Sequence, residues 1–259
     1  ARAAIRASVE PGWREGWEAV EAAASNALAE PTSRELAAAR AVAQGTPEGV
    51  ALFVSSSMPI RDVDTASGIV TREVRLFANR GASGIDGIVS SALGVATGLP
   101  RPVLPSEAGA ATTPPRPRGV CLLGDLALLH DASGLGLARE ADVVFVVVNN
   151  DGGGIFHALP IASYDPPFTE LFATPQGRDL GALAAAYGVP HEVIEGAASA
   201  TDLGAALGGA LGVALDAGGT RIIEVRTDRS TEMAARAADR ARAIEAARAA
   251  LARTGSDRA

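Results

Sequence analysis

The sequence predicts an α/β protein built on a doubly wound, mainly parallel sheet with helices on both faces. Short apolar segments recur along the chain, and helical segments separate them. Strands that are apolar throughout are typical of parallel sheets, because helices cover both faces of such a sheet. With 259 residues and 47% hydrophobic content, the chain is long and apolar enough to bury the core that this fold requires.

Two helices are predicted before the first strand. Residues 1–10 read as a linker from a preceding domain, and the proline at position 11 suits the first turn of a helix over 11–28. Trp13 and Trp17 recur at helical spacing within this segment. A second helix is predicted over 32–44, where a glycine-containing stretch ends it.

Strands and helices then alternate to the end of the chain. The predicted strands span residues 51–54, 75–78, 120–123, 143–148, 192–194 and 221–225. The predicted helices span residues 58–66, 86–98, 126–139, 180–187, 201–217 and 231–252. Thr201 is expected to cap the helix that it begins. Residues 100–118 hold six prolines and are expected to form a mobile surface loop, whereas residues 150–178 read as irregular. We expect one domain over 11–259.

Charge and composition exclude several classes of protein. The net charge of −7 argues against a nucleic-acid partner, which needs a basic surface to neutralise phosphates. The longest apolar run, 143–148, is far too short to span a membrane. Cys121 is the only cysteine, so no internal disulfide can form, and this thiol is expected to be an inert core residue. A cytoplasmic location is expected.

Two polar motifs follow neighbouring apolar strands. Gly124 and Asp125 come directly after the strand 120–123, and an Asn-Asn-Asp-Gly sequence that contains Asn150 and Gly152 follows the strand 143–148. The carboxyl ends of parallel strands meet at one edge of the sheet, where ligands of such folds bind. The Asp125 carboxylate, the Asn150 amide oxygen and the Gly152 carbonyl are the hard oxygen ligands that Mg²⁺ prefers. Gly124 would let the backbone approach a phosphate closely, and the start of the following helix would favour its charge.

This pair of motifs resembles the cofactor fingerprint of thiamine-diphosphate-dependent enzymes. That fingerprint has Gly-Asp, about one crossover of residues, and then Asn-Asn; the common form has glycine where this chain has Leu126. Longer segments resemble one family, the 2-succinyl-5-enolpyruvyl-6-hydroxy-3-cyclohexene-1-carboxylate synthases of menaquinone biosynthesis. The most specific is the Asn-Arg-Gly-Ala-Ser-Gly-Ile-Asp-Gly segment at 79–87. The segments 53–61 and 148–156, with the Leu-Pro pair at 159–160, are also similar, and the resemblance covers about 11–225.

The resemblance implies a role for each matching residue. Ile85 and Arg80 would be catalytic residues, and Ile85 would wedge under the bent cofactor. Arg80 and Arg61, with Ser57 beside them, would hold substrate carboxylates. The residues implied to line the pocket near the thiazolium ring are Ile155, Phe156 and Leu159. The residues implied to contact the cofactor are Gly124, Asp125, Leu126, Asn150, Gly152 and Ile85. Asp125, Asn150 and Gly152 would ligate Mg²⁺ or Mn²⁺.

The resemblance also implies a reaction and an assembly. On thiamine diphosphate, 2-oxoglutarate would be decarboxylated and the resulting succinyl-semialdehyde carbanion added to isochorismate. Arginines suit these two multiply charged substrates, because a guanidinium binds a carboxylate bidentately. The family has an N-terminal pyrimidine-binding domain, supplied by a second subunit, and no such domain precedes residue 11. We therefore interpret the chain as the C-terminal part of a homodimeric or homotetrameric enzyme, inactive alone.

Structural alternatives exist for several of these residues. Arg80 could be a surface ion-pair partner, Arg61 a structural residue at a helix start, and Ile85 a core residue. Ser57 and the two serines before it could simply cap the helix 58–66. Two functional alternatives also stay open. One is another thiamine-diphosphate enzyme, of the acetohydroxyacid synthase or 2-oxo acid decarboxylase type. The other is a degenerate, non-catalytic dimerisation domain.

Overall fold

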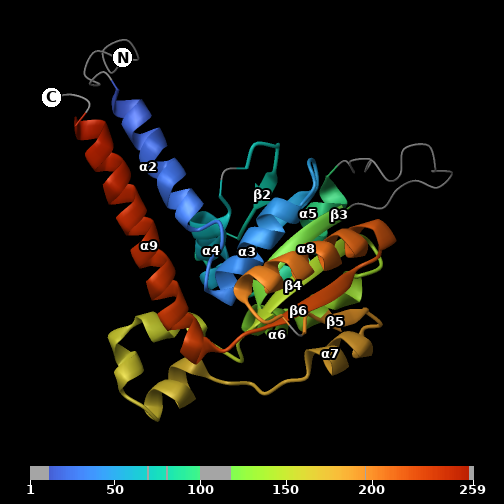
Figure 1. The fold of residues 1–259 in the computed structure, drawn as a ribbon. Coiled ribbons are helices and arrows are strands. Elements are labelled where there is room, and N and C mark those ends of the chain that lie inside the picture. The colour runs from blue at the N-terminus through green and yellow to red at the C-terminus, as the bar shows by residue number, and fades with distance from the viewer. Residues whose placement is uncertain (1–11, 69, 80, 100–117, 196, 257–259) are drawn as a thin grey trace.

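A six-stranded parallel sheet forms the centre of the molecule (Figure 1). The computed structural model describes residues 12–68, 70–79, 81–99, 118–195 and 197–256. The strand order is β2-β1-β3-β4-β6-β5, and every neighbouring pair is parallel. The strands are β1 (Ala51–Val54), β2 (Arg75–Phe77), β3 (Arg118–Gly124), β4 (Asp142–Asn149), β5 (His191–Val193) and β6 (Arg221–Arg226). The predicted fold class is confirmed.

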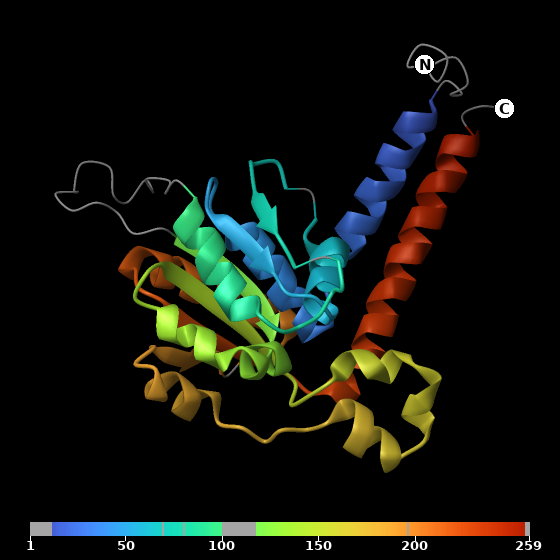
Figure 2. The ribbon, with the colours of Figure 1, turned by 180° about the vertical axis from the view of Figure 1, so that it is seen from behind.

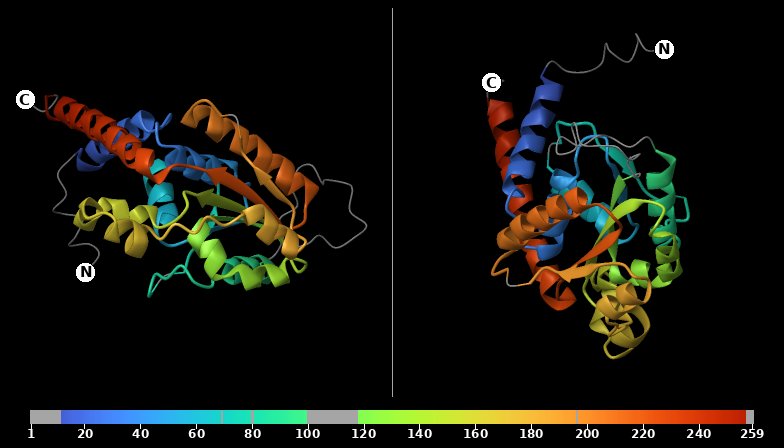
Figure 3. Two further views of the ribbon diagram at one scale, coloured as in Figure 1. Left: turned by 90° about the horizontal axis from the view of Figure 1, so that it is seen from below. Right: turned by 90° about the vertical axis from the view of Figure 1, so that its right-hand side faces the viewer.

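Helices cover both faces of this sheet (Figure 3). One face carries α3 (Arg34–Gly45), α4 (Met58–Ala66) and α8 (Ala200–Ala217), and the other carries α5 (Ile88–Gly98), α6 (Asp125–His130) and α7 (Leu180–Ala186). Successive side chains of β4 alternate between these layers. Val144 and Val146 belong to the cluster that includes Leu211 of α8, whereas Phe145 and Val147 belong to the opposite cluster. A strand buried on both sides is expected to be apolar throughout, and β4 is apolar from Val143 to Val148.

Two helices pack side by side and project from this body as an arm (Figures 1 and 2). They are α2 (Trp13–Ala27) and α9 (Arg229–Ser256). Trp13 and Trp17 of α2 contact each other edge to face, with ring centroids 6.2 Å apart, and both are more than half exposed. The final helix begins two residues earlier than predicted because the Asp228 carboxylate accepts a hydrogen bond from the Ser230 N–H, 2.8 Å away.

The helix predicted over 126–139 is wrong in its length. α6 ends at His130, and a 3₁₀ helix, η3 (Ala132–Leu137), follows. The break is at Asp131, whose carboxylate accepts hydrogen bonds from the N–H of Ser90 at 2.6 Å and from its hydroxyl at 3.0 Å. These bonds satisfy a backbone donor in the first turn of α5, where the helix itself supplies no acceptor. A tertiary contact therefore ends the helix.

Other boundaries also differ from the prediction. Ser199, and not Thr201, caps α8, through a capping box with Asp202. The irregular stretch contains short helices, which are η4 (Gly154–Ala158), η5 (Pro160–Ser163) and the π-helical η6 (Thr169–Ala173). The expected linker at 1–10 and the expected loop at 100–118 lie outside the described residues, apart from the first residue of β3. No helix in the described ranges is both long and apolar enough to cross a membrane.

Candidate active site

A cavity of about 450 Å³ opens at the carboxyl ends of β1, β3 and β4. The chain leaves β1 for β2 on one side and returns through β3 on the other, so the cavity lies at the point where the strand order reverses. Ligands of open α/β sheets bind at such a point. The serines after β1, the Gly124–Asp125 pair after β3 and the loop after β4 all line this cavity. The predicted meeting of the two polar motifs is therefore confirmed by their shared cavity.

Asp125 is the one carboxylate of these motifs that lies at the cavity and is almost fully buried, with 4% of its surface exposed. Burial raises the pKa of Asp125 to about 6, although hydrogen bonds from the N–H groups of Leu126 and Gly152 partly offset this. A carboxylate removed from water in this way gains most from a cation that replaces its lost hydration. The environment of Asp125 thus fits a metal ligand.

The two neighbouring asparagines after β4 use their amides differently. Both ends of the Asn149 amide make hydrogen bonds within the protein. Its Nδ2 donates to Glu224 Oε1 at 2.8 Å, and its Oδ1 accepts from the Asp151 N–H at 3.0 Å. Asn150 donates from Nδ2 to Glu35 Oε1 at 2.8 Å, but its Oδ1 is buried and accepts no hydrogen bond within the described structure. Only Asn150 lines the cavity. Since a buried polar atom without a partner costs free energy, this oxygen fits a position that a cation would satisfy.

The glycines at the site have different reasons for being glycine. Gly152 has φ +135°, and a Cβ there would lie 2.1 Å from the carbonyl oxygen of Ala173, so the loop itself requires glycine. Gly124 has φ −89°, and a Cβ would meet nothing closer than the Val148 carbonyl oxygen at 4.0 Å. The protein alone therefore does not require Gly124. The space in front of it is open to a ligand, as expected for a residue that lets a diphosphate approach.

Most, but not all, of the apolar residues predicted for the site line the cavity. Ile85, Leu126, Ile155 and Phe156 line the cavity, and Ile85 also packs against the core cluster that contains α5. Leu159 does not line it and has 47% of its surface exposed. Ile85 therefore both packs against the core and lines the cavity.

Ser57 and Arg61 lie at the cavity, but the expected cap is absent. Ser57 makes no side-chain cap to α4, and its φ of +75° is unusual for a residue with a side chain. Strained backbone of this kind is concentrated at binding sites. Arg61 donates from Nη1 to the Ser57 carbonyl oxygen at 2.6 Å and is otherwise exposed beside the cavity. Arg80 lies outside the described residues.

Sequence reasoning missed Glu35 as a site residue. It lies in the first turn of α3, is buried, and lines the cavity 115 positions away in sequence from Asn150, which it contacts. An acidic residue in a first turn is ordinary, because it complements the helix dipole. No local signal therefore distinguished it. Among the described residues, no three His, Cys, Asp or Glu side chains are grouped so that they could hold a metal ion by themselves.

Residues 82–225, more than half of the chain, match the family described as thiamine pyrophosphate enzyme, C-terminal TPP binding domain. The chain belongs to this family. It is 45% identical over 197 residues to the 2-succinyl-5-enolpyruvyl-6-hydroxy-3-cyclohexene-1-carboxylate synthase of Halorubrum lacusprofundi, covering 74% of the chain and 29% of that protein. The synthase of the same name from Rubrobacter xylanophilus is 39% identical over 236 residues, covering 89% of the chain and 37% of that protein.

A solved structure shares the fold of this chain. Benzoylformate decarboxylase from Polynucleobacter necessarius superposes with a TM-score of 0.54 at 19% identity, covering 75% of this chain and 33% of that one. This likeness concerns the fold. The chain spans about a third of the length of the curated relatives that it matches. The resemblance to this group of synthases, predicted from the 79–87 segment, is confirmed by these relatives.

Proposed function

We propose that this chain is the C-terminal, cofactor-binding domain of a 2-succinyl-5-enolpyruvyl-6-hydroxy-3-cyclohexene-1-carboxylate synthase. The whole enzyme decarboxylates 2-oxoglutarate with thiamine diphosphate and joins the product to isochorismate. The observation that carries the proposal is the convergence of buried Asp125 and the unpartnered Asn150 Oδ1 at one cavity, in a chain whose relatives bear the synthase name. The domain extends over 11–259, beyond the limits of the family match.

The metal and diphosphate belong at the loops after β3 and β4. The Asp125 carboxylate, the Asn150 Oδ1 and the Gly152 carbonyl are the ligands that this chain offers to Mg²⁺ or Mn²⁺. Gly124 leaves the space for the diphosphate that the cation would bridge. When bound, thiamine diphosphate supplies the electron sink for decarboxylation.

The residues on the other side of the cavity suit the substrates. Arg61, together with Arg80, binds carboxylates of 2-oxoglutarate and isochorismate, and Ser57 lies beside Arg61. Ile85, Ile155 and Phe156 form the apolar wall that orients the cofactor and excludes water from the reacting carbon. Leu159, exposed in this chain, would join that wall only when other parts of the enzyme cover it.

The family resemblance also implies an assembly for the whole enzyme. A pyrimidine-binding domain from a second subunit completes the site in a homodimer or homotetramer, and the enzyme acts in the cytoplasm. This chain alone is expected to be inactive.

The test is carbon dioxide release from 2-oxoglutarate by the protein at its full natural length, with thiamine diphosphate and Mg²⁺, with and without isochorismate. Release that isochorismate stimulates and that Asp125→Ala abolishes supports the proposal. Release from pyruvate would instead assign the chain to an acetohydroxyacid synthase or 2-oxo acid decarboxylase. No release from either substrate would favour the non-catalytic dimerisation domain.

A further inference from the structure

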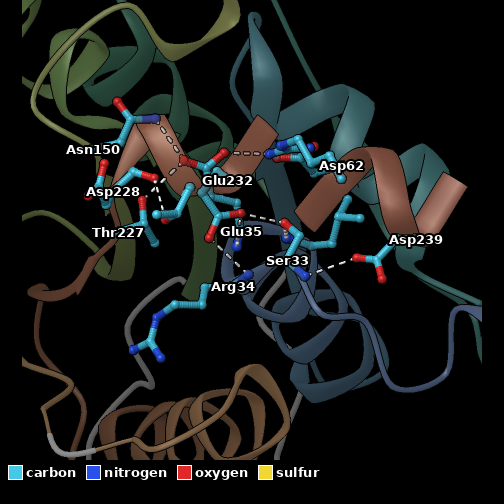
Figure 4. Close-up of polar contacts among 12 residues, drawn as sticks. Ser33, Arg34, Glu35, Asp62, Asn150, Thr227, Asp228, Glu232 and Asp239 are labelled. Carbon is cyan, nitrogen blue, oxygen red and sulfur yellow. Dashed lines mark hydrogen bonds and ion pairs between the residues drawn. The ribbon is translucent and has the colours of Figure 1, made fainter. Parts of the chain in front are cut away.

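A group of buried charged side chains lies beside the cavity, and Figure 4 shows the contacts among them. Glu35, with 3% of its surface exposed, is at its centre. Its Oε1 accepts from Asn150 Nδ2 at 2.8 Å and from the Thr227 hydroxyl at 3.1 Å. Its Oε2 accepts from Arg236 of α9. Both carboxylate oxygens of Glu35 therefore accept hydrogen bonds. One of these bonds comes from Asn150, which lines the cavity.

Helix α9 fixes the same asparagine from a second direction. Arg236 also donates to Asp62, with Nη2 lying 2.8 Å from Oδ2, so this guanidinium is held between two buried carboxylates. About two turns earlier in α9, Arg229 donates from Nη1 to the carbonyl oxygens of Asn150, at 3.0 Å, and Asp151. The side chain of Asn150 is thus held by Glu35, and its backbone is held by Arg229.

The chemistry of Glu35 decides which end of the Asn150 amide faces the cavity. An ionised carboxylate only accepts hydrogen bonds, so it must meet the NH₂ end of the amide. The opposite orientation would place Asn150 Oδ1 against a carboxylate oxygen and would direct the NH₂ group at the cation. Because Oδ1 then remains without a protein partner, the contact with Glu35 presents a ligand oxygen to the site before any metal arrives.

We propose that Glu35 is a positioning residue for the metal, which orients Asn150 so that Oδ1 is a ligand. The inference rests on the proposed function, since it needs the Mg²⁺ site formed with Asp125. Glu35 does not touch the cation. It acts through the hydrogen bond to Nδ2, and residues of α3 and α9 thereby determine the geometry of a site formed by loops after β3 and β4.

The decisive variant is Glu35→Gln, which changes almost no volume. Arg236 needs an acceptor, so the glutamine oxygen faces Arg236 and its NH₂ group faces Asn150. Asn150 must then turn its Oδ1 toward residue 35 and its NH₂ group toward the cavity. Loss of an outer-shell partner of a ligand costs about 10- to 100-fold in metal affinity, and we expect a weakening of this size in the dissociation constant for Mg²⁺.

Glu232→Gln is the matched control. Glu232 is buried to the same degree and belongs to the same group of charges, but it accepts from the Ser33 hydroxyl at 2.6 Å and from the Arg34 N–H at 3.0 Å, and makes no hydrogen bond to Asn150. The Glu232→Gln substitution removes one negative charge beside α3, as Glu35→Gln does. It is expected to lower thermal stability without a selective loss of Mg²⁺ affinity.

An exchange variant, Glu35→Gln with Asn150→Asp, restores the hydrogen bond with donor and acceptor reversed. One oxygen of the new aspartate accepts from the glutamine NH₂, and the other faces the cavity. Mg²⁺ affinity is expected to return toward that of the parent. Because its buried groups are again paired, this variant also carries the test if Glu35→Gln does not fold.

The measurement is calorimetric titration of Mg²⁺ into the protein at its full natural length, saturated with thiamine diphosphate, with a thermal unfolding curve for each variant. If the parent does not bind Mg²⁺, the proposed function itself fails. If the parent binds and Glu35→Gln binds equally well, the positioning role is wrong. Equal weakening by Glu232→Gln, or an exchange variant that folds but binds at least about tenfold more weakly than the parent, would also overturn the role.

Discussion

The two glycines at the site are expected to respond in opposite ways to replacement by alanine. In Gly152→Ala, a Cβ would lie 2.1 Å from the Ala173 carbonyl oxygen, and the residue would be held at φ +135°. Strained backbone of this kind costs about 1–3 kcal/mol. The hydrogen bond from the Gly153 N–H to the same carbonyl, now 2.6 Å long, must also break, at about 1 kcal/mol. We expect a total loss of about 2–4 kcal/mol in the free energy of unfolding without cofactor.

Gly124→Ala is the matched comparison, because both substitutions add one methyl group to a glycine that lines the same cavity. The backbone there has φ −89°, and the nearest protein atom to a Cβ is 4.0 Å away. Stability without cofactor should therefore change by no more than about 0.5 kcal/mol. The methyl group would occupy the space of the diphosphate, so we expect thiamine diphosphate to bind about tenfold more weakly, a change of about 1.4 kcal/mol.

Denaturant unfolding of the cofactor-free protein and calorimetric titration of thiamine diphosphate separate the two effects. We expect Gly152→Ala to lower the free energy of unfolding. We expect Gly124→Ala to leave the free energy of unfolding unchanged and to weaken cofactor binding. A Gly124→Ala protein that binds the cofactor as the parent does would refute the diphosphate position. Equal destabilisation by both substitutions would refute the geometric argument for Gly152.

Three further predictions concern the same loops and the core. Asn150→Ala should abolish Mg²⁺ binding. Asn149→Ala should mainly lower thermal stability, because it leaves buried Glu224 without one donor. Equal Mg²⁺ affinities of these two variants in calorimetry would contradict this. A proton must leave Asp125, whose pKa burial raises to about 6, before the cation binds. Mg²⁺ affinity should therefore fall as the pH drops below about 6, and affinities that do not change across this range in calorimetric titrations would contradict the role of Asp125. Leu211→Ala, which truncates a fully buried core residue of α8, should cost about 2–5 kcal/mol in denaturant unfolding; a loss under about 1 kcal/mol would contradict the packing.

The sheet and the polar residues that follow β3 and β4 were predictable from sequence because their causes are local. Each residue of β4 from Val143 to Val148 is apolar, which indicates burial on both faces, and the polar residues that follow mark the ligand edge. The family resemblance in segment 79–87 supplied Ile85, which composition alone would assign to the core. These signals needed no knowledge of distant contacts.

The remaining features depend on contacts between distant segments. The end of α6 is set by Asp131 and Ser90, which are 41 positions apart. Leu126 to Arg139 has no proline that would end a helix, so periodicity alone favours one continuous helix. Glu35 is a site residue only because folding places it beside Asn150. Such roles follow from packing geometry, and a single sequence does not reveal them.

The contacts of α3 and α9 with the site bear on how this protein could be divided. The family match covers 82–225, yet the side chains that hold Asn150 come from positions 35 and 229, with Arg236 holding Glu35, and β1 and β2 also precede the match. A protein trimmed to the matched segment would keep Asp125 and Asn150 but lose the edge of the sheet beside them and every charged group that supports the asparagine. Shared sequence therefore marks a smaller unit than the one that must be transplanted to carry this cavity into another protein.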